Sequence, residues 1–171
     1  MAEATVGARM RIRDATAADV PRLAAIYNEG IEDRVATFET RPRTDDQVAA
    51  WLGGLPLLVA EEDGHVVGFA RVSAYSDRCV YDGIGEHGVY VARAARGRGL
   101  GRALLDALAQ AAGAAGYHKL TSRVFADNAA SRPAHRAAGF EEVGVQRRHG
   151  RLDGEWRDCV LVERLIGEAA D

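Results

Sequence analysis

The sequence has few cysteines and no long apolar run, and each absence argues against a class of protein. Its two cysteines, Cys79 and Cys159, stand far apart without a CxxC pair, so neither a disulfide framework nor a zinc site is indicated. No apolar run approaches the ~18 residues of a membrane span. The opening MAEATVGARMRIR lacks the apolar stretch of a signal peptide. We therefore expect a cytoplasmic protein with no membrane partner and no metal.

An excess of charge of either sign is also absent. The chain of 171 residues has a formal net charge of -3 and a pI near 6.0, which gives no electrostatic reason to expect nucleic acid as a partner. Hydrophobic residues make up 47% of the chain, enough for one domain with a proper core. No repeat or linker divides it. We expect a single domain over residues 10–166 that acts on small molecules, with loose terminal extensions at 1–9 and 167–171.

Hydrophobic periodicity predicts an α/β protein. The order of elements indicates a mixed central sheet of about seven strands with helices on both faces. Thr16 and Asp19 form a plausible capping pair for the first helix, and Asp63-Gly64 is a strong hairpin signal. The expected strands lie at 10–16, within 56–75 as a pair, at 86–95, at 119–128 and within 140–166 as a pair; the expected helices lie at 16–33, 44–55, 102–115 and 129–140.

The segment VYVARAARGRGLGRALLDAL, residues 89–108, joins a β-branched run to an Ala/Leu helix through a loop of arginine and glycine. A Walker loop would end in Gly-Lys-Ser/Thr, but Arg102 follows Gly101, which argues against a triphosphate with magnesium. A dinucleotide fingerprint, Gly-x-Gly-x-x-Gly, is not present either. The pattern is Arg-x-x-Gly-x-Gly between a strand and a helix. Converging backbone N–H groups, the helix N-terminus and the arginines would there hold a pyrophosphate.

With this loop the sequence resembles the Gcn5-related N-acetyltransferases (GNAT), roughly over residues 10–166. The resemblance implies the GNAT fold and acetyl-CoA as the acetyl donor, with its pyrophosphate on the loop. It also implies that backbone N–H groups of a splayed strand polarise the acetyl carbonyl. The cofactor-binding residues that it implies here are Val89, Tyr90, Val91, Arg96, Gly97, Arg98, Gly99, Leu100, Gly101 and Arg102.

A second motif, ADNAASRPAHRAAGFEEVG, supports the same family. The resemblance implies that Asn128 contacts the pantetheine arm of the cofactor, and we place Ser131 beside it. The residue seven positions after this asparagine is commonly a tyrosine near the thioester sulfur. Here it is His135, which is able to deliver a proton in the same way but titrates near neutrality.

Three segments resemble the phosphinothricin and arsinothricin N-acetyltransferases within this family: IYNEGIEDRVATFETRP, YDGIGEHGVYV and LDGEWRDCVLVERL. This resemblance implies acetylation of the α-amine of a small toxic glutamate analogue, which confers resistance, and it implies a homodimer. Methionine sulfoximine or sulfone is the nearest alternative substrate. A non-catalytic sensor of acyl-CoA is the alternative from another class of function.

The chemistry requires a base, because an amine attacks a thioester only after it has lost its proton. Glu86 stands at the start of the strand EHGVYV and matches the glutamate assigned as base in this branch; it acts directly or through one water. His135 is the candidate that protonates the departing thiolate. His87 should point to the opposite face of the strand from Glu86. No cysteine is expected at the reaction centre, which favours direct transfer in a ternary complex.

An acceptor with a carboxylate and an anionic side group needs forked cations and hydroxyls around it. Gly88 either gives room for a close approach of the acetyl group to the splayed strand around Val89 to Val91 or marks a bulge. Asn28 is expected to hydrogen-bond either the substrate or a neighbouring loop. The candidate substrate-binding residues are Asn28, Phe38, Thr40, Arg71, Arg78 and Tyr81.

Overall fold

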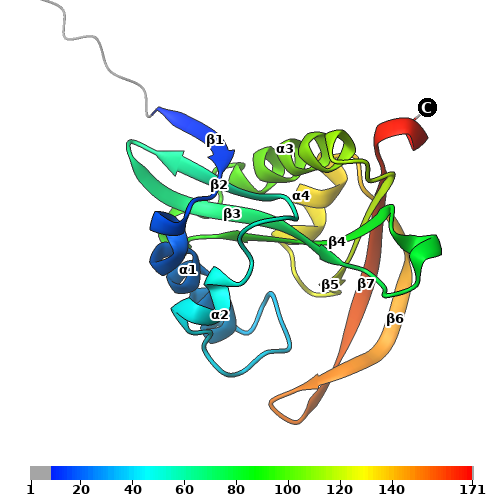
Figure 1. Cartoon of the computed structure of the whole chain (residues 1–171). Coiled ribbons are helices and arrows are strands. Elements are labelled where there is room, and N and C mark those ends of the chain that lie inside the picture. Colours follow the sequence, from blue (N-terminus) through cyan, green and yellow to red (C-terminus); the bar gives the residue numbers. More distant parts are fainter. Residues whose placement is uncertain (1–8, 171) are drawn as a thin grey trace, which may run out of the picture.

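In the part of the chain that the structure describes, seven strands form one mixed sheet in the order β1-β2-β3-β4-β5-β7-β6 (Figure 1). The computed structural model describes residues 9–170. Only β4 and β5 run parallel; all other neighbours are antiparallel. The expectation of a mixed sheet is confirmed. The strands are β1 (Met10–Asp14), β2 (Leu57–Glu62), β3 (His65–Ala74), β4 (Ile84–Val91), β5 (Lys119–Phe125), β6 (Glu141–Leu152) and β7 (Glu155–Leu165).

Helices cover both faces of this sheet. On one face lie α1 (Val20–Asp33) and α2 (Asp45–Ala49), and on the other lie α3 (Leu100–Ala114) and α4 (Ser131–Ala137). The strands alternate accordingly: Val59 and Phe69 pack toward α1, whereas Leu58 and Ala70 pack toward α3. None of the helices within residues 9–170 is long and apolar enough to cross a membrane.

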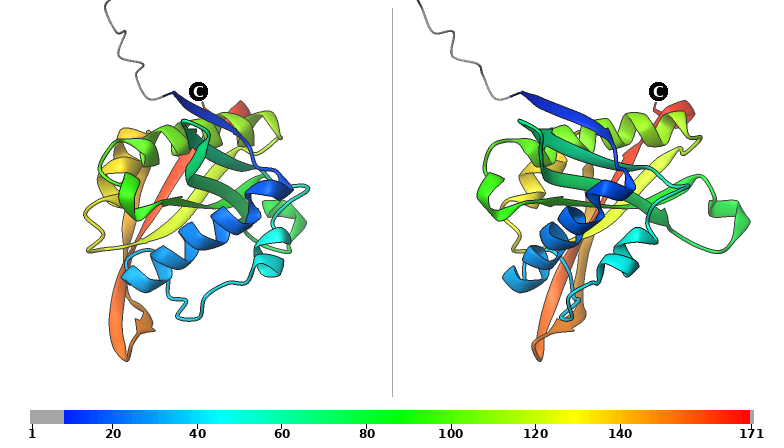
Figure 2. Two further views of the ribbon diagram at one scale, coloured as in Figure 1. Left: turned by 90° about the vertical axis from the view of Figure 1, so that its left-hand side faces the viewer. Right: turned by 60° about the vertical axis from the view of Figure 1, so that its left-hand side comes forward.

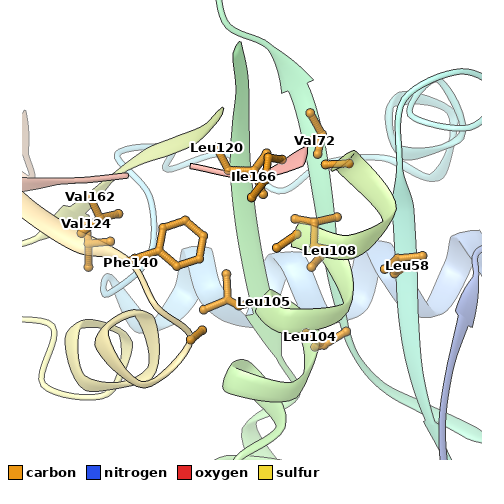
Figure 3. Close-up of a cluster of buried hydrophobic side chains, with 14 of the residues drawn as sticks. Leu58, Val72, Leu104, Leu105, Leu108, Leu120, Val124, Phe140, Val162 and Ile166 are labelled. Carbon is orange, nitrogen blue, oxygen red and sulfur yellow. The ribbon is translucent and has the colours of Figure 1, made fainter. Parts of the chain in front are cut away.

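The larger core lies between the sheet and α3. Leu104, Leu105 and Leu108 are fully buried there, and Figure 3 shows them facing a group that includes Leu120 of β5 and Phe140 after α4. The three leucines follow helical spacing, so one stripe of α3 is removed from water. Burying each of them is worth roughly 1.5–3 kcal/mol, which anchors the helix whose N-terminus carries the arginine and glycine loop.

The two halves of the sheet separate in the middle. β4 pairs with β5 only from Ile84 to Glu86. Beyond Glu86, β4 continues alongside β3 as far as Val91, while β5 continues alongside β7 as far as Phe125. The edge of β4 from His87 to Val91 therefore has no strand partner on the β5 side among the described residues. We call this opening the splay.

Two of the three local predictions about where elements begin or end are confirmed by the structure. Thr16 and Asp19 form the expected capping box, and the turn between β2 and β3 has positive φ at both Asp63 and Gly64. The helix expected at 44–55 is wrong in length, because α2 ends at Ala49. Gly53 has a φ of 82°, a left-handed conformation that no α-helix continues through.

The chain ends differ in part from the expectation of loose extensions. At the C-terminal end, Gly167–Ala169 form a 3-10 turn against the end of α3 (Figure 1). A Cβ on Gly113 would lie 3.2 Å from the backbone nitrogen of Gly167, so the two segments pack closely. At the other end, the Arg9 amide donates to Asp63 Oδ1 at 3.1 Å. The rest of the expected N-terminal extension and residue 171 lie outside the described residues.

Candidate functional site

The loop before α3 presents a run of unpaired backbone amides. Gly97 and Gly99 have φ values of 80° and 79°, and a Cβ on either would meet nothing within 4 Å. Conformation rather than space therefore requires glycine here. In the described part of the chain, the amides from Gly97 to Arg102 have no hydrogen-bond acceptor. Converging N–H groups at a helix N-terminus form a cradle for phosphate oxygens.

The three arginines of this loop already pair with carboxylates. Arg96 also donates to the carbonyl oxygen of Val91 at 3.2 Å, so it ties the end of β4 to the end of α1. These pairs neutralise part of the positive potential expected from the loop, which leaves the backbone amides as the main anion-binding groups. The ion pairs are Arg96–Asp33 at 2.6 Å, Arg98–Glu62 at 2.9 Å and Arg102–Asp106 at 3.8 Å.

Glu86 stands where the splay begins, since it is the last residue of β4 that pairs with β5. Its side chain shares a face of β4 with Gly88 and Tyr90, and the Tyr90 ring packs against Tyr27 of α1. Glu86 is thus on the α1 face of the sheet. Its side chain is 40% exposed, and its Oε1 lies 3.7 Å from a guanidinium nitrogen of Arg123 on β5.

His87 points to the opposite face, as predicted. Its side chain is only 4% exposed and packs against the Phe140 ring at 4.8 Å between centroids. On this face it meets His135 of α4, with the two Nε2 atoms 3.0 Å apart. Glu86 and His135 therefore approach the splay from opposite faces of the sheet, and His87 is the direct neighbour of His135.

The contacts of the two histidines determine where their protons lie. His135 Nδ1 is 2.8 Å from the carbonyl oxygen of Ser131, so this nitrogen carries the proton. In a neutral His135 the Nε2 is then an acceptor, and His87 must donate from its own Nε2. His87 Nδ1 has no hydrogen-bond partner within residues 9–170. In the neutral pair, each of the two N–H protons is therefore already donated in a hydrogen bond, and neither is available to a third group.

Burial keeps this pair neutral. It lowers the pKa of both imidazoles, and the neighbouring His135 lowers the pKa of His87 further. A carbonyl oxygen of Ser131 acts against the shift at His135. At neutral pH both rings are uncharged.

Asn128 and Ser131 shape the start of α4. The Asn128 Oδ1 accepts from the Ser131 amide at 3.0 Å, and its Nδ2 donates to the Val35 carbonyl oxygen at 2.9 Å. Asn128 therefore connects α4 to the loop that follows α1. Both ends of its amide are engaged by the protein, and the expected contact with pantetheine stays a prediction.

Arg71 on β3 is a cation without a carboxylate partner. It pairs across the sheet with Gly88 and lies over the Trp51 ring at 4.2 Å. It forms no ion pair with any described carboxylate, and its burial lowers the pKa of the guanidinium. Gly88 pairs in regular register, so the alternative of a bulge is wrong. A Cβ on Gly88 would lie 3.1 Å from the Tyr90 ring, so the glycine lets that ring lie against the strand.

The loop between α1 and α2 carries two of the candidate residues, Phe38 and Thr40, and a third, Asn28 of α1, binds it. Asn28 bonds this loop, with its Nδ2 donating to the Arg43 carbonyl and its Oδ1 accepting from the Arg43 amide; of the two alternatives for Asn28, the structure has the loop contact. Phe38 packs edge-on against Phe125 of β5, with ring centroids 4.8 Å apart. Phe38 and Thr40 line an open hollow of about 360 Å³.

Arg78 and Tyr81 lie apart from this group. They belong to the loop between β3 and β4, which projects from the body of the molecule (Figure 2). The Arg78 guanidinium lies 5.6 Å from the centre of the Tyr81 ring, and that ring packs edge-on against Tyr75. No interaction within residues 9–170 joins them to Glu86 or Arg71. The structure thus does not bring this predicted pair together with the other substrate candidates.

Sequence reasoning missed Arg123. A charged residue in the middle of the strand KLTSRVF is the signal that could have found it, since a strand buried on both faces is apolar throughout. Its Nε donates to Gln146 Oε1 of β6 at 3.0 Å. Among the described residues no cluster of three His, Cys, Asp or Glu could hold a metal ion.

The chain is similar in sequence to known proteins. A sequence model of the acetyltransferase (GNAT) family matches residues 23–140. The chain is 36% identical over 158 residues to the L-methionine sulfoximine/L-methionine sulfone acetyltransferase of Pseudomonas aeruginosa, covering 89% of this chain and 92% of that protein. It is also 36% identical to the phosphinothricin N-acetyltransferase of Alcaligenes faecalis, over 86% of this chain and 78% of that one.

A solved structure shares the fold over nearly the whole chain. It is a GNAT superfamily phosphinothricin acetyltransferase from Sinorhizobium meliloti in complex with acetyl-CoA, with a TM-score of 0.87 and 34% sequence identity. The match covers 93% of this chain and 89% of that one.

Proposed function

Since this chain belongs to the acetyltransferase (GNAT) family, we propose that it acetylates the α-amine of a small amino acid with an anionic, glutamate-like side group. The observation that carries the proposal is the position of Glu86 at the opening of the splay, with Arg71, which forms no ion pair within residues 9–170, one strand away. A base and a free cation on one face are what an ammonium-bearing, anionic acceptor requires.

The donor of the family is acetyl-CoA, and the chain has the groups to hold it. Acetyl-CoA, when bound, supplies the thioester whose acetyl group is transferred. The free amides from Gly97 to Arg102 are suited to its pyrophosphate. The unpaired edge of β4 around Val89, Tyr90 and Val91 supplies N–H groups that polarise the acetyl carbonyl.

In this proposal Glu86 removes the proton of the acceptor ammonium. Its carboxylate is within reach of solvent, so it takes the proton directly or through one ordered water. The distance of 3.7 Å to Arg123 is longer than a hydrogen bond, which leaves the carboxylate oxygens free to accept. Glu86 acts on the α1 face, where Phe38 of the loop after α1 packs against Phe125 of β5.

We assign to His135 the protonation of the departing CoA thiolate. The contacts of its two ring nitrogens show what must change before it is able to do so. Its Nε2 faces His87 at 3.0 Å, and its Nδ1 proton is held by the Ser131 carbonyl. The role requires that Nε2 exchange the contact with His87 for the sulfur. It also requires that a proton reach the pair, so His135 acts together with His87 rather than alone.

Direct transfer is favoured over a covalent acyl-enzyme. Of the two cysteines, Cys79 is exposed and Cys159 is buried. Burial raises the pKa of the Cys159 thiol, which removes the thiolate that nucleophilic catalysis needs. We therefore retain a ternary complex in which the amine attacks the thioester itself.

Phosphinothricin and arsinothricin are the acceptors that we propose, because each combines an α-amino acid with an anionic side group. N-acetylation removes the ammonium charge by which a glutamate mimic engages its target, which would confer resistance. Methionine sulfoximine or sulfone is the second candidate, supported by the relative from Pseudomonas aeruginosa. We also propose that the chain works in the cytoplasm, as one domain over residues 10–166 and as a homodimer.

The test is release of free thiol from acetyl-CoA with each of these amino acids and with glutamate. We expect release with phosphinothricin and arsinothricin at a higher kcat/KM than with methionine sulfoximine. A preference for the sulfoximine would replace the proposed substrate by the second candidate. Binding of acetyl-CoA without release for any amine would instead support the non-catalytic sensor and overturn the enzymatic proposal.

A further inference from the structure

Arg123 of β5 lies on the same face of the sheet as Glu86. Thr121, Arg123 and Phe125 alternate along β5 on one face, and Phe125 packs there against Phe38 of the loop after α1. The Arg123 side chain is 40% exposed, and it reaches toward both Glu86 and Gln146. It is therefore a solvent-accessible cation beside the proposed base.

Strand register places Arg123 opposite Arg71. Gly88 pairs with Arg71 on β3, and Glu86 pairs with Thr121 on β5. Because β4 and β5 run parallel, Gly88 and Arg123 each lie two residues beyond that last pair. Arg71 and Arg123 thus flank Gly88 at one level of the sheet. Two strand spacings of about 4.8 Å separate their backbones, and more where the splay opens.

The two guanidinium groups are poorly neutralised. Arg71 forms no ion pair among the described residues, and the Glu39 carboxylate acts on it only as a weaker electrostatic neighbour that raises its pKa. Among residues 9–170, the one carboxylate in an ion pair with Arg123 is Glu86, at 3.7 Å, and Glu86 is the group that must accept a proton during the proposed reaction. Protonation of Glu86 would leave both cations unpaired. Between them Gly88 has no side chain of its own and the Tyr90 ring lies over it, so an acceptor that spans the two arginines would lie against this ring.

We propose that Arg123 determines acceptor specificity: it binds one anionic group of the amino acid while Arg71 binds the other. The α-carboxylate and the side-group oxyanion of a glutamate-like molecule would span the two arginines, with the amine directed toward Glu86. The site then takes dianionic amino acids in preference to those with a neutral side group. This inference rests on the proposed function.

The experiment compares Arg123→Gln, Arg123→Lys and wild type with phosphinothricin and with methionine sulfoximine. We expect Arg123→Gln to lower kcat/KM for phosphinothricin at least tenfold more than for the sulfoximine, chiefly through KM, and Arg123→Lys to restore most of the loss. Arg11→Gln is the matched control, because Arg11 is an exposed arginine of β1 that pairs with Glu61, away from the splay.

Two results would overturn this assignment while leaving the proposed function intact. One is an equal loss for both substrates with a common shift of their pH profiles, which would mean that Arg123 acts only through Glu86. The other is unchanged kinetics for both. If wild type acetylates neither substrate, the proposed function itself fails, and that result is distinct from either of these.

Discussion

Replacing His87 by leucine should change how the stability of the protein depends on pH. The imidazole is 4% exposed, and its Nδ1 has no partner in the described structure. Burial lowers its pKa from 6.5 to about 3. Between pH 6.5 and pH 3, His87 therefore binds a proton in the unfolded chain but not in the folded protein. The free energy of unfolding decreases as the pH falls through this range.

The size of this loss follows from the two pKa values. At pH 5.5 the unfolded chain gains about 1.4 kcal/mol from protonating one histidine of pKa near 6.5, and at pH 7.5 it gains almost nothing. Wild type carries this loss at His87, and the lowered pKa of His135 adds a loss of the same sign, whereas His87→Leu keeps only the contribution of His135. At pH 7.5 the variant itself is less stable by about 1–3 kcal/mol, because the His135 Nε2 loses its donor.

The assay is urea unfolding of both proteins at pH 7.5 and pH 5.5. Between these values His87→Leu should lose about 1.4 kcal/mol less stability than wild type. Carboxylates contribute to the loss in both proteins and cancel in the comparison. His149→Gln, at an exposed position on β6, is the control and should follow wild type. An equal loss in wild type and His87→Leu would refute the neutral, buried pair.

Two glycine substitutions separate the cofactor cradle from the acceptor side. Gly99→Ala places a side chain at a φ of 79°. It should lower the free energy of unfolding by about 1–2 kcal/mol and raise KM for acetyl-CoA. Gly64→Ala, with a φ of 82° in a distant turn, is the control: it should lower stability by a similar amount without a change in KM. Gly150→Ala puts a Cβ 2.8 Å from the Phe38 ring, so KM for the amino acid should rise while KM for acetyl-CoA stays constant. Gly144→Ala on the same strand meets nothing within 4 Å and should leave both values unchanged; a similar effect at both positions would contradict the role of Phe38.

Features that depend on neighbours in sequence were predictable. The hairpin at Asp63-Gly64, the capping box at Thr16 and the left-handed glycines with free amides around Gly99 each follow from local backbone chemistry, and the structure has all three. That these amides hold a pyrophosphate stays a prediction. The length of α2 was not predictable from apolar spacing, because Trp51 and Leu52 continue the helical pattern while the backbone leaves the helix before Gly53.

The site itself depends on contacts between distant segments. That His87 faces away from Glu86 follows from strand alternation, but its contact with His135 requires that α4 dock on the far face of β4. Arg123 comes beside Glu86 only through the short register between β4 and β5. Periodicity within one segment carries no information on either arrangement. The charge in the middle of β5 could have marked Arg123 as a candidate, but neither its position beside Glu86 nor the histidine pair could be derived from the sequence.

The most direct test of the central claim is the rate of acetyl transfer by Glu86→Gln at saturating phosphinothricin and acetyl-CoA. With Glu86 as the base on the acceptor amine, kcat should fall by at least about 100-fold. The dissociation constant for acetyl-CoA should stay unchanged, since the cradle at Gly97 to Arg102 is untouched. Glu141→Gln, at an exposed position on β6, should behave as wild type. A Glu86→Gln protein that keeps kcat within a few-fold of wild type would contradict the account.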